Sequence, residues 1–302
     1  MIEIWEPGLL TTVQDGGRVG WARYGVPPSG PLDEMSFQAA NRLVGNPPNT
    51  AGLEITLTGP TLRCSRPSLV AVCGADFELW AGNLRVPTWH AVFLRAGQWL
   101  RFGEQLQGAR AYLAIDGGVD VPPFLESRST YLAGGFGGLD GRALRRGDRL
   151  PLGPGVSQPA MRAGRVWPAS RRPSYLSVPT LRVVLGPQDD YFTRQGLETF
   201  LTAAYTLSPE SNRMGARLQG VPIAHRDATG IVSDGVITGS VQVPADGQPI
   251  VMLADHQTTG GYPKIATVIR ADLPLLAQVM PGDRVRFEAV DVTEAQSLWL
   301  ER

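Results

Sequence analysis

The sequence of 302 residues has one lysine, three histidines, two cysteines and no formal net charge. Basic residues never form a run longer than a pair, so the chain lacks the electrostatic footprint of a protein that binds nucleic acid or an anionic membrane. No apolar window approaches membrane-spanning length, and the N-terminus lacks the pattern of a signal peptide. We therefore expect a cytoplasmic protein whose ligands are small molecules and protein partners.

The few cysteines and histidines argue against a metal site. Cys64 and Cys73 lie in neighbouring strand-like runs and form no CxxC pair, so we expect buried thiols rather than a disulfide or a nucleophile. His90, His225 and His256 show no metal-ligand spacing, and neither HExxH nor GxSxG occurs. Zinc chemistry and a GxSxG hydrolase are therefore disfavoured.

Glycine and proline are abundant instead, with 36 and 25 residues, which indicates many turns and few long helices. Asp33 is placed to cap a helix that runs to about Leu43 and stops at Gly45. Short strands separated by turns then predict a mainly β barrel fold. The expected strands are Leu53 to Leu57, Thr61 to Cys64, Leu69 to Cys73, Phe77 to Trp80, Ala91 to Leu94, Trp99 to Phe102 and Ala111 to Ile115.

The second half of the chain repeats features of the first in the same order. Thr238-Gly239 echoes Thr58-Gly59, and the turn at Gly282 echoes the turn at Gly97, at an offset of about 180 residues. We interpret this as an internal duplication that produced two β domains. The expected domains are residues 1–165 and 181–302, joined by a linker at 166–180 that is rich in Pro, Ser and Arg.

The only lysine, Lys264, ends a polar loop that begins at Asp255 and joins two strand-like runs, Ile250 to Leu253 and Ile265 to Ile269. The other 27 residues of the basic set are arginine, and arginine cannot replace a compact, titratable amine. We expect Lys264 to be functional. The alternatives are a solvated hairpin turn, or a structural lysine paired with Asp255.

Two glycine-rich loops are further candidates. The first contains Asp15, Arg18 and Ser29 and is long for a compact domain, which favours a functional role. Its alternative is a structural loop in which Asp15 pairs with Arg18. The second loop contains Arg128 and Ser129 and resembles a cradle for phosphate or carboxylate, although no GxxxxGK[ST] follows. An irregular structural loop is equally compatible with it.

Six motifs in order resemble one protein family. They are Gln14-Asp15-Gly16-Gly17-Arg18, Gly25-Val26-Pro27-Pro28-Ser29-Gly30, Ser127-Arg128-Ser129-Thr130, Gly186-Pro187-Gln188-Asp189-Asp190, Ser211-Asn212-Arg213-Met214-Gly215 and the loop from Asp255 to Lys264. Over about Ile2 to Phe287 the chain is similar to the biotin-dependent carboxyltransferase, or allophanate hydrolase subunit 2, family.

The resemblance implies two tandem cyclophilin-like β-barrels and a multi-subunit enzyme. Its first implication is one component of an ATP-dependent 5-oxoprolinase, which acts with the A subunit and with a cyclophilin-like, kinase-inhibitor-like B subunit to open 5-oxoproline to glutamate. ATP would enter through the complex, because this chain has no ATP motif. A biotin-dependent carboxyltransferase or a component that processes urea or allophanate is the second reading, and biotin belongs to it alone. A regulatory partner of the B subunit, without chemistry of its own, is the third.

Both chemistries act on an amide-like carbonyl, and they need donors for negative charge and a base for a proton. Lys264, Arg213 and the N–H groups around Gly260 and Gly261 are the expected donors, and His256 or Asp255 is the expected base. Catalysis is thus assigned to Lys264, His256 and Asp255. Substrate contacts are assigned to Arg213, Asn212, Thr258, Thr259, Gly260, Gly261, Tyr262, Arg128, Ser129, Asp15, Arg18 and Ser29. Activity of the isolated chain is left open.

Overall fold

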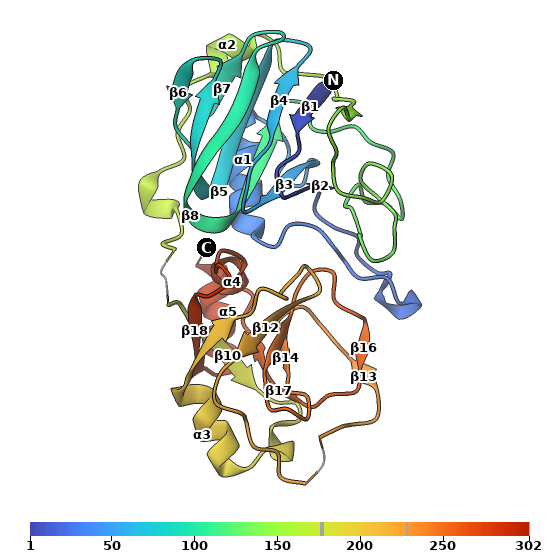
Figure 1. The fold of residues 1–302 in the computed structure, drawn as a ribbon, viewed down its shortest axis with the longest axis vertical. Coiled ribbons are helices and arrows are strands. Elements are labelled where there is room, and N and C mark those ends of the chain that lie inside the picture. The colour runs from blue at the N-terminus through green and yellow to red at the C-terminus, as the bar shows by residue number, and fades with distance from the viewer. Residues whose placement is uncertain (176–177, 228, 302) are drawn as a thin grey trace. The chain divides into compact units, whose positions relative to one another are not determined.

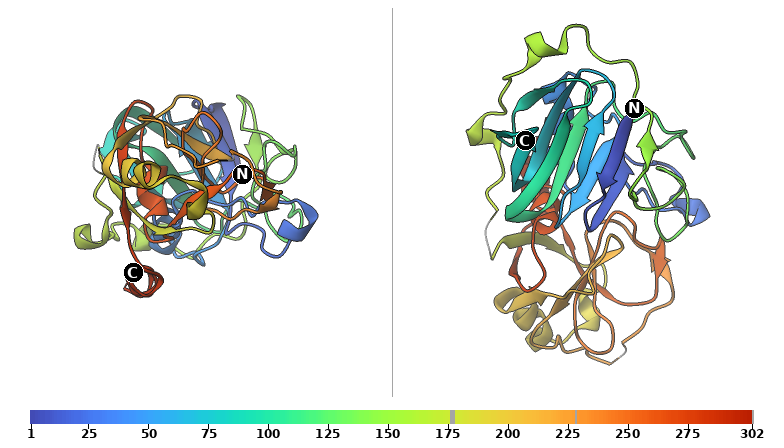
Figure 2. Two further views of the ribbon diagram at one scale, coloured as in Figure 1. Left: turned by 90° about the horizontal axis from the view of Figure 1, so that it is seen from below. Right: turned by 45° about the horizontal axis from the view of Figure 1, so that its top comes forward.

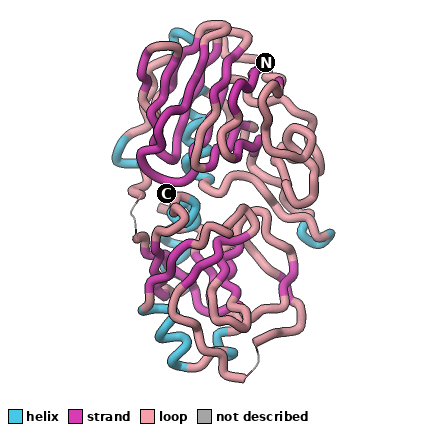
Figure 3. The backbone as a smooth tube through the Cα atoms, in the orientation of Figure 1, coloured by secondary structure: helices cyan, strands magenta, loops and turns pink. Residues whose placement is uncertain are grey.

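The computed structural model describes residues 1–175, 178–227 and 229–301. The chain divides into two compact units, one made of residues 1–18 and 29–174, the other of residues 19–28 and 175–302. The predicted domain boundaries at 165 and 181 remain predictions, and residues 176 and 177 of the predicted linker lie outside the described residues. Strands and loops dominate the backbone in both units, as Figure 3 shows, so the expected mainly β class is confirmed.

The first unit is built on a sheet of nine strands with two short helices (Figure 1). Its elements are β1 (Ile2–Glu6), β2 (Leu10–Gln14), α1 (Glu34–Val44), β3 (Gly52–Thr56), β4 (Thr61–Cys64), β5 (Ser68–Ala81), β6 (Leu84–Val86), β7 (Ala91–Leu94), β8 (Trp99–Ile115), β9 (Arg149–Leu150), α2 (Pro159–Arg162) and the 3-10 turn η2 (Ala169–Arg171). The strands follow the order β2-β3-β8-β4-β1-β9. Strand β5 also pairs with β8, and β6 and β7 pair with β5. The sheet therefore forms a half-barrel.

Two strands are much longer than the sequence predicted. The runs Leu69 to Cys73 and Phe77 to Trp80 are parts of β5, and Trp99 to Phe102 and Ala111 to Ile115 are parts of β8. The pairing of β5 with β8 shifts register between Gly74 and Leu79. Irregular pairing of this kind lets a strand bend without ending. Gly74, where two separate strands were expected, thus lies at an irregularity within one continuous strand. The right-hand view of Figure 2 shows the long strands of this sheet.

Helix α1 begins and ends as predicted. The Asp33 carboxylate accepts a hydrogen bond from the Ser36 N–H at 3.0 Å, and Gly45 ends the helix with a φ of +83°. The helix packs on β5 and β8, where Phe37 meets Tyr112 edge-on at 6.0 Å. A buried cluster on this face includes Cys73, whereas Cys64 lies in the main core on the other side of the sheet. Both cysteines are free, as expected.

The second unit contains a closed barrel of seven strands in the order β10-β17-β14-β15-β12-β11-β18. Its elements are η1 (Ala22–Tyr24), β10 (Thr180–Leu185), η3 (Asp189–Tyr191), α3 (Arg194–Thr202), β11 (Ala204–Leu207), β12 (Gly215–Gln219), β13 (Asp234–Gly235), β14 (Ser240–Gln242), β15 (Ile250–Met252), β16 (Thr259–Gly260), β17 (Lys264–Val268), α4 (Leu273–Ala277), β18 (Arg284–Ala289) and α5 (Val292–Leu300). The short strands β13 and β16 pair only with each other, beside the barrel in Figure 1. They position the candidate site.

One of the two turn pairs expected from duplication is equivalent. Gly97 and Gly282 both have left-handed backbones. Gly97 donates its N–H to the carbonyl of Cys64, the last residue of β4, and Gly282 donates its N–H to the carbonyl of Leu207, the last residue of β11. Gly239 is left-handed with a φ of +93°, but Gly59 is not among the residues with positive φ. The Gly59 and Gly239 turns therefore differ, and that part of the expectation is wrong.

None of the helices in the described part of the chain is long and apolar enough to cross a membrane.

Candidate functional site

Lys264 is the first residue of β17, and its side chain is buried. The strand begins one residue earlier than predicted, so the lysine belongs to the barrel wall rather than to a solvated turn. Its ammonium donates to the Asp234 carboxylate and, at 2.9 Å, to the Gly235 carbonyl. The side chain of Lys264 is 4% exposed and that of Asp234 is 54% exposed. The partner is therefore Asp234, and the alternative pairing with Asp255 is wrong.

Gln188 joins this ion pair to the Gly186–Asp190 segment. Lys264 donates its main-chain N–H to the Gln188 side-chain oxygen at 3.1 Å, and Gln188 donates its own N–H to the Lys264 carbonyl at 3.1 Å. The Gln188 amide also donates to Asp234 at 3.4 Å. The ammonium lowers the pKa of the Asp234 carboxyl, mainly through their hydrogen bond. Three segments far apart in sequence thus hold one charged cluster.

Asp255 forms a second, deeper ion pair with Arg213. The guanidinium donates from Nε at 2.9 Å and from Nη2 at 3.1 Å, one bond to each carboxylate oxygen. The Asp255 main-chain N–H also donates to the Arg213 carbonyl at 2.9 Å. The side chains are only 4% and 2% exposed, so the carboxylate is shielded from substrate and solvent. This geometry fits a structural clamp at the start of the loop better than the predicted base.

His256 is buried and suited to accept a proton. Its Nδ1 lies 2.6 Å from the Gln257 carbonyl oxygen, which can only accept, so Nδ1 carries the hydrogen and Nε2 has a free lone pair. Burial lowers the pKa of the imidazole below its ordinary value of 6.5, although the Gln257 carbonyl and Asp255 oppose this. The ring is therefore neutral near pH 7, as a base must be.

The remaining residues of the loop differ in exposure. Gln242 braces the loop by accepting from Gln257 at 3.2 Å and donating to the Tyr262 carbonyl at 3.4 Å. A Cβ on Gly260 would overlap the Gln242 amide, so a larger residue there would have to displace the Gln242 side chain. Among the predicted contacts, Thr259 and Tyr262 are exposed, whereas Thr258, Gly260 and Gly261 are half-buried.

Asn212 has a local role in the turn before β12. Its side-chain oxygen accepts the Met214 N–H at 2.8 Å, and its own N–H donates to Gly215. The predicted substrate contact at Asn212 is therefore a turn-forming interaction in this structure. It holds the chain beside Arg213, and with it the clamp on Asp255.

The other candidates lie in the first unit, where Asp15 ties two glycine-rich loops together. Its carboxylate accepts from the Gly17 N–H, the Arg128 N–H and the hydroxyls of Ser127 and Ser129. Asp15 thus has the hydrogen-bond pattern of a structural anchor. Donors from both loops hold it, and the alternative pairing with Arg18 stays a prediction.

Arg18 and Ser29 are both buried. Arg18 donates to the Ser129 carbonyl and lies over the Phe136 ring, 5.2 Å from its centroid. Ser29 has a left-handed backbone with a φ of +53°, and within the described residues its hydroxyl has no hydrogen-bond partner. Gly30 next to it donates to the Gln14 side chain at 3.1 Å. These contacts explain why the loop is ordered.

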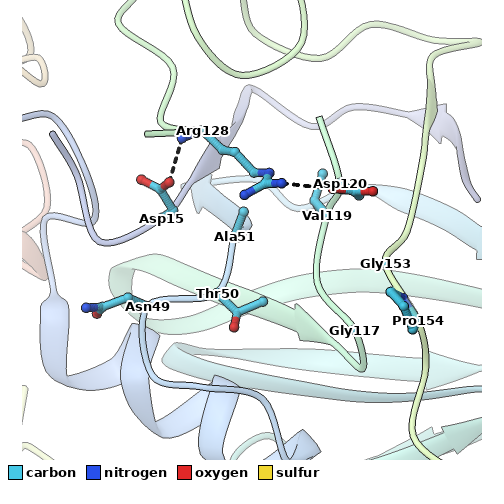
Figure 4. A pocket seen from close by; sticks show the side chains of 10 residues that line it. All are labelled: Asp15, Asn49, Thr50, Ala51, Gly117, Val119, Asp120, Arg128, Gly153 and Pro154. Carbon is cyan, nitrogen blue, oxygen red and sulfur yellow. Dashed lines mark hydrogen bonds and ion pairs between the residues drawn. The ribbon is translucent and has the colours of Figure 1, made fainter. Parts of the chain in front are cut away.

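Arg128 borders a hollow of about 220 Å³ beside Asp15. Its guanidinium donates to Asp120 at 2.9 Å and to the Val121 carbonyl at 2.8 Å, and Figure 4 shows the side chain between the two acids. The hollow is lined by Asp15, Asn49, Thr50, Ala51, Gly117, Val119, Asp120, Arg128, Gly153 and Pro154. Two acids and one arginine give this hollow no surplus of positive charge for an anion.

Asp234 and Gln188 are the two residues of the lysine cluster that were missing from the predicted site. Gln188 lies in a motif that was noted, but Asp234 stands 30 positions before Lys264 in a stretch without a motif. The only local indication of a turn or loop at Asp234 was the glycine that follows it, Gly235. No group of three or more histidine, cysteine or acidic side chains in the described ranges is placed to hold a metal ion.

The model of the carboxyltransferase domain, subdomain A and B, matches residues 24–289 of the sequence. The chain belongs to the carboxyltransferase domain family. It is 41% identical to the 5-oxoprolinase C subunit of Escherichia coli (strain K12), over 98% of this chain and 93% of the relative. It is 36% identical to the 5-oxoprolinase C subunit of Haemophilus influenzae, over 99% and 94%.

The crystal structure of K. lactis urea amidolyase contains a similar domain. It matches with a TM-score of 0.90 and 33% identity, and the match covers 98% of this chain and 19% of that chain. The carboxyltransferase domain described here thus corresponds to about a fifth of the larger protein. The family resemblance and the mainly β fold expected from the sequence are both confirmed.

Within this carboxyltransferase domain, the second unit offers three distinct chemical groups. The Lys264 ammonium can hold negative charge on a ligand, and the neutral His256 can accept a proton at Nε2. The buried pair of Arg213 and Asp255 fixes the chain just before His256. The candidate residues fall in two groups, one in each unit, and each group is held by contacts within its own unit.

Proposed function

We propose that the chain is a catalytic component of an ATP-dependent 5-oxoprolinase, in which it acts on the lactam carbonyl as 5-oxoproline opens to glutamate. The near-complete coverage of two proteins named as the C subunit of 5-oxoprolinase supports this substrate class. The observation that carries the proposal is the buried ammonium of the only lysine, held by Asp234 of β13. A buried amine beside an exposed acid is suited to bind an anionic group.

The proposed roles follow the contacts. Lys264 holds negative charge of the substrate, as a carboxylate or as the developing oxyanion, and His256 accepts a proton at Nε2. Arg213 and Asp255 act indirectly by clamping the loop. Thr259 and Tyr262, two exposed residues of the loop, are the proposed substrate contacts next to Lys264. In the first unit, Asp15, Arg18, Ser29, Arg128 and Ser129 order the glycine-rich loops.

The proposed partners are the A and B subunits of the 5-oxoprolinase, with ATP used by the complex rather than by this chain alone. The relatives' own names, which give each protein a letter within one enzyme, imply such an assembly for them. The cytoplasm is the proposed location, and two unpaired cysteines suit a reducing compartment. We also propose that the two units arose by duplication, which the equivalent Gly97 and Gly282 turns support.

The decisive assay measures ADP release by the chain mixed with the A and B subunits, with 5-oxoproline, urea or allophanate as substrate. Turnover of 5-oxoproline alone is expected. Lys264→Met should lower it by about two to three orders of magnitude, the usual effect of losing one preorganised donor. Stability should change little, because Asp234 is already half in solvent and remains hydrated without the ammonium.

Lys264→Arg should restore only part of the rate, because a planar guanidinium displaces the charge. Arg194→Met is the matched control, since Arg194 is 93% exposed on α3, away from the lysine contacts. Full turnover by Lys264→Met would exclude a catalytic lysine. A complex that forms but never releases ADP with any substrate would favour the regulatory role.

A biotin-dependent carboxyltransferase acting on urea is the second candidate, supported by the similarity to K. lactis urea amidolyase. Biotin would be a cofactor only for this carboxyltransferase reaction. Urea-dependent ADP release in a mixture that also contains a biotinylated carrier, a biotin carboxylase and bicarbonate would favour it.

A further inference from the structure

The ion pair of Lys264 and Asp234 is strongly asymmetric in burial. The lysine side chain is 4% exposed and the aspartate side chain 54%. Lys264 starts a barrel strand and cannot carry its charge into solvent, whereas Asp234 can rotate into water and keep its charge hydrated. If this pair opens, the carboxylate is the group that leaves.

The donors around Asp234 would survive its departure. Lys264 and the Gln188 amide both donate to Oδ2, and the Gly235 N–H donates to Oδ1 at 2.7 Å. Lys264 and Gln188 belong to other segments than Asp234. The main chain beside Asp234 is fixed by the pairing of β13 with β16 and by the bond from the Val236 N–H to Thr258. Rotation of one side chain thus uncovers donors already arranged for a carboxylate.

The second buried cation of this unit behaves differently. Arg213 and Asp255 are both nearly inaccessible and share two parallel bonds, so neither can exchange with an external ligand without unfolding the loop. The contrast identifies Lys264 as the exchangeable cation of the two. Asp234 is its removable partner.

We propose that Asp234 is an internal stand-in for a substrate carboxylate, which displaces it from Lys264 and Gln188 on binding. The exchange leaves the buried ammonium paired throughout, so it avoids the penalty of an isolated charge. The inference rests on the proposed function, because 5-oxoproline carries a carboxylate next to its lactam and urea has none. The cluster then selects anionic lactams over neutral amides.

The single lysine makes a direct test feasible. Full chain grown with lysine labelled at Nζ gives one side-chain nitrogen signal, which belongs to Lys264. 5-Oxoproline should shift this signal in a saturable way, and the neutral 2-pyrrolidinone should not. In Asp234→Asn, which lacks the internal competitor, the midpoint for 5-oxoproline should fall by about tenfold if the competitor fills the site in nine tenths of molecules. Asp190→Asn, at an exposed acid in η3, is the control and should match the unmodified chain.

An unchanged or higher midpoint in Asp234→Asn, or an equal shift with 2-pyrrolidinone, would overturn the stand-in role. The two proposals fail separately. Turnover of 5-oxoproline without any response of the lysine signal removes this inference and leaves the function intact. A carboxylate-specific response, tightened in Asp234→Asn but without ADP release in the complex, supports the inference and removes the function.

Discussion

The buried pair of Arg213 and Asp255 gives the sharpest stability prediction, because it decides between a structural and a catalytic role for Asp255. In Asp255→Asn the guanidinium keeps its place, 4% exposed, but loses its carboxylate. Breaking a buried pair from one side costs about 3 to 5 kcal/mol, because the remaining charge cannot reach water. We expect a loss of that size in the free energy of unfolding.

A double variant tests whether the unpaired buried charge causes this loss of stability. Arg213→Met combined with Asp255→Leu removes both charges and fills the space with apolar side chains, so it should recover most of the lost stability. Glu198→Gln, which breaks the exposed pair with Arg194, should change stability by less than about 1 kcal/mol. Urea unfolding followed by tryptophan fluorescence and circular dichroism measures all four proteins.

The opposite outcome is equally clear. If Asp255→Asn keeps its unfolding free energy but loses turnover with the A and B subunits, the carboxylate acts in the chemistry and the clamp is wrong.

Three further predictions concern other residues. Burial lowers the pKa of the His256 imidazole below 6.5, so as the pH falls through 6.5 the unfolded chain binds a proton that the folded chain does not. The free energy of unfolding should therefore fall over this range. His256→Gln should flatten its pH dependence, measured by urea unfolding between pH 8 and pH 5. Phe37→Ala should destabilise the first unit by about 3 to 5 kcal/mol, measured by urea unfolding, because it empties the space between α1 and Tyr112. Burial raises the pKa values of both cysteines, that of Cys73 most strongly, so a thiol reagent at pH 8 should modify neither until the protein unfolds.

Local signals in the sequence were enough for much of the fold. Asp33 and Gly45 mark both ends of α1 because caps are determined by neighbouring residues. The limits of β4 and β7 were also predicted correctly, because their ends depend on neighbouring residues as well. The split of β5 into two strands failed at Gly74, because a glycine in a bend of a strand looks like a glycine in a turn.

The candidate site was predictable only where one residue stood out. Lys264 is found by composition, but Asp234 is not, because their contact depends on the pairing of two-residue strands far apart in sequence. The same applies to Asp255, whose partner Arg213 lies 42 positions earlier. Long-range pairing of this kind leaves no periodic trace in the chain.

Strand β8 serves as a common wall for both buried clusters of the first unit. Leu113 and Ile115 face the main core, while Tyr112 and Ala114 face the cluster under α1. A slip of β8 by one residue would exchange these faces, placing the Tyr112 hydroxyl in the apolar core and removing its hydrogen bond to Glu54. Neither cluster can therefore loosen while the other stays intact, and amide protons of α1 and of β8 are expected to exchange with deuterium at the same slow rate, as one cooperative block.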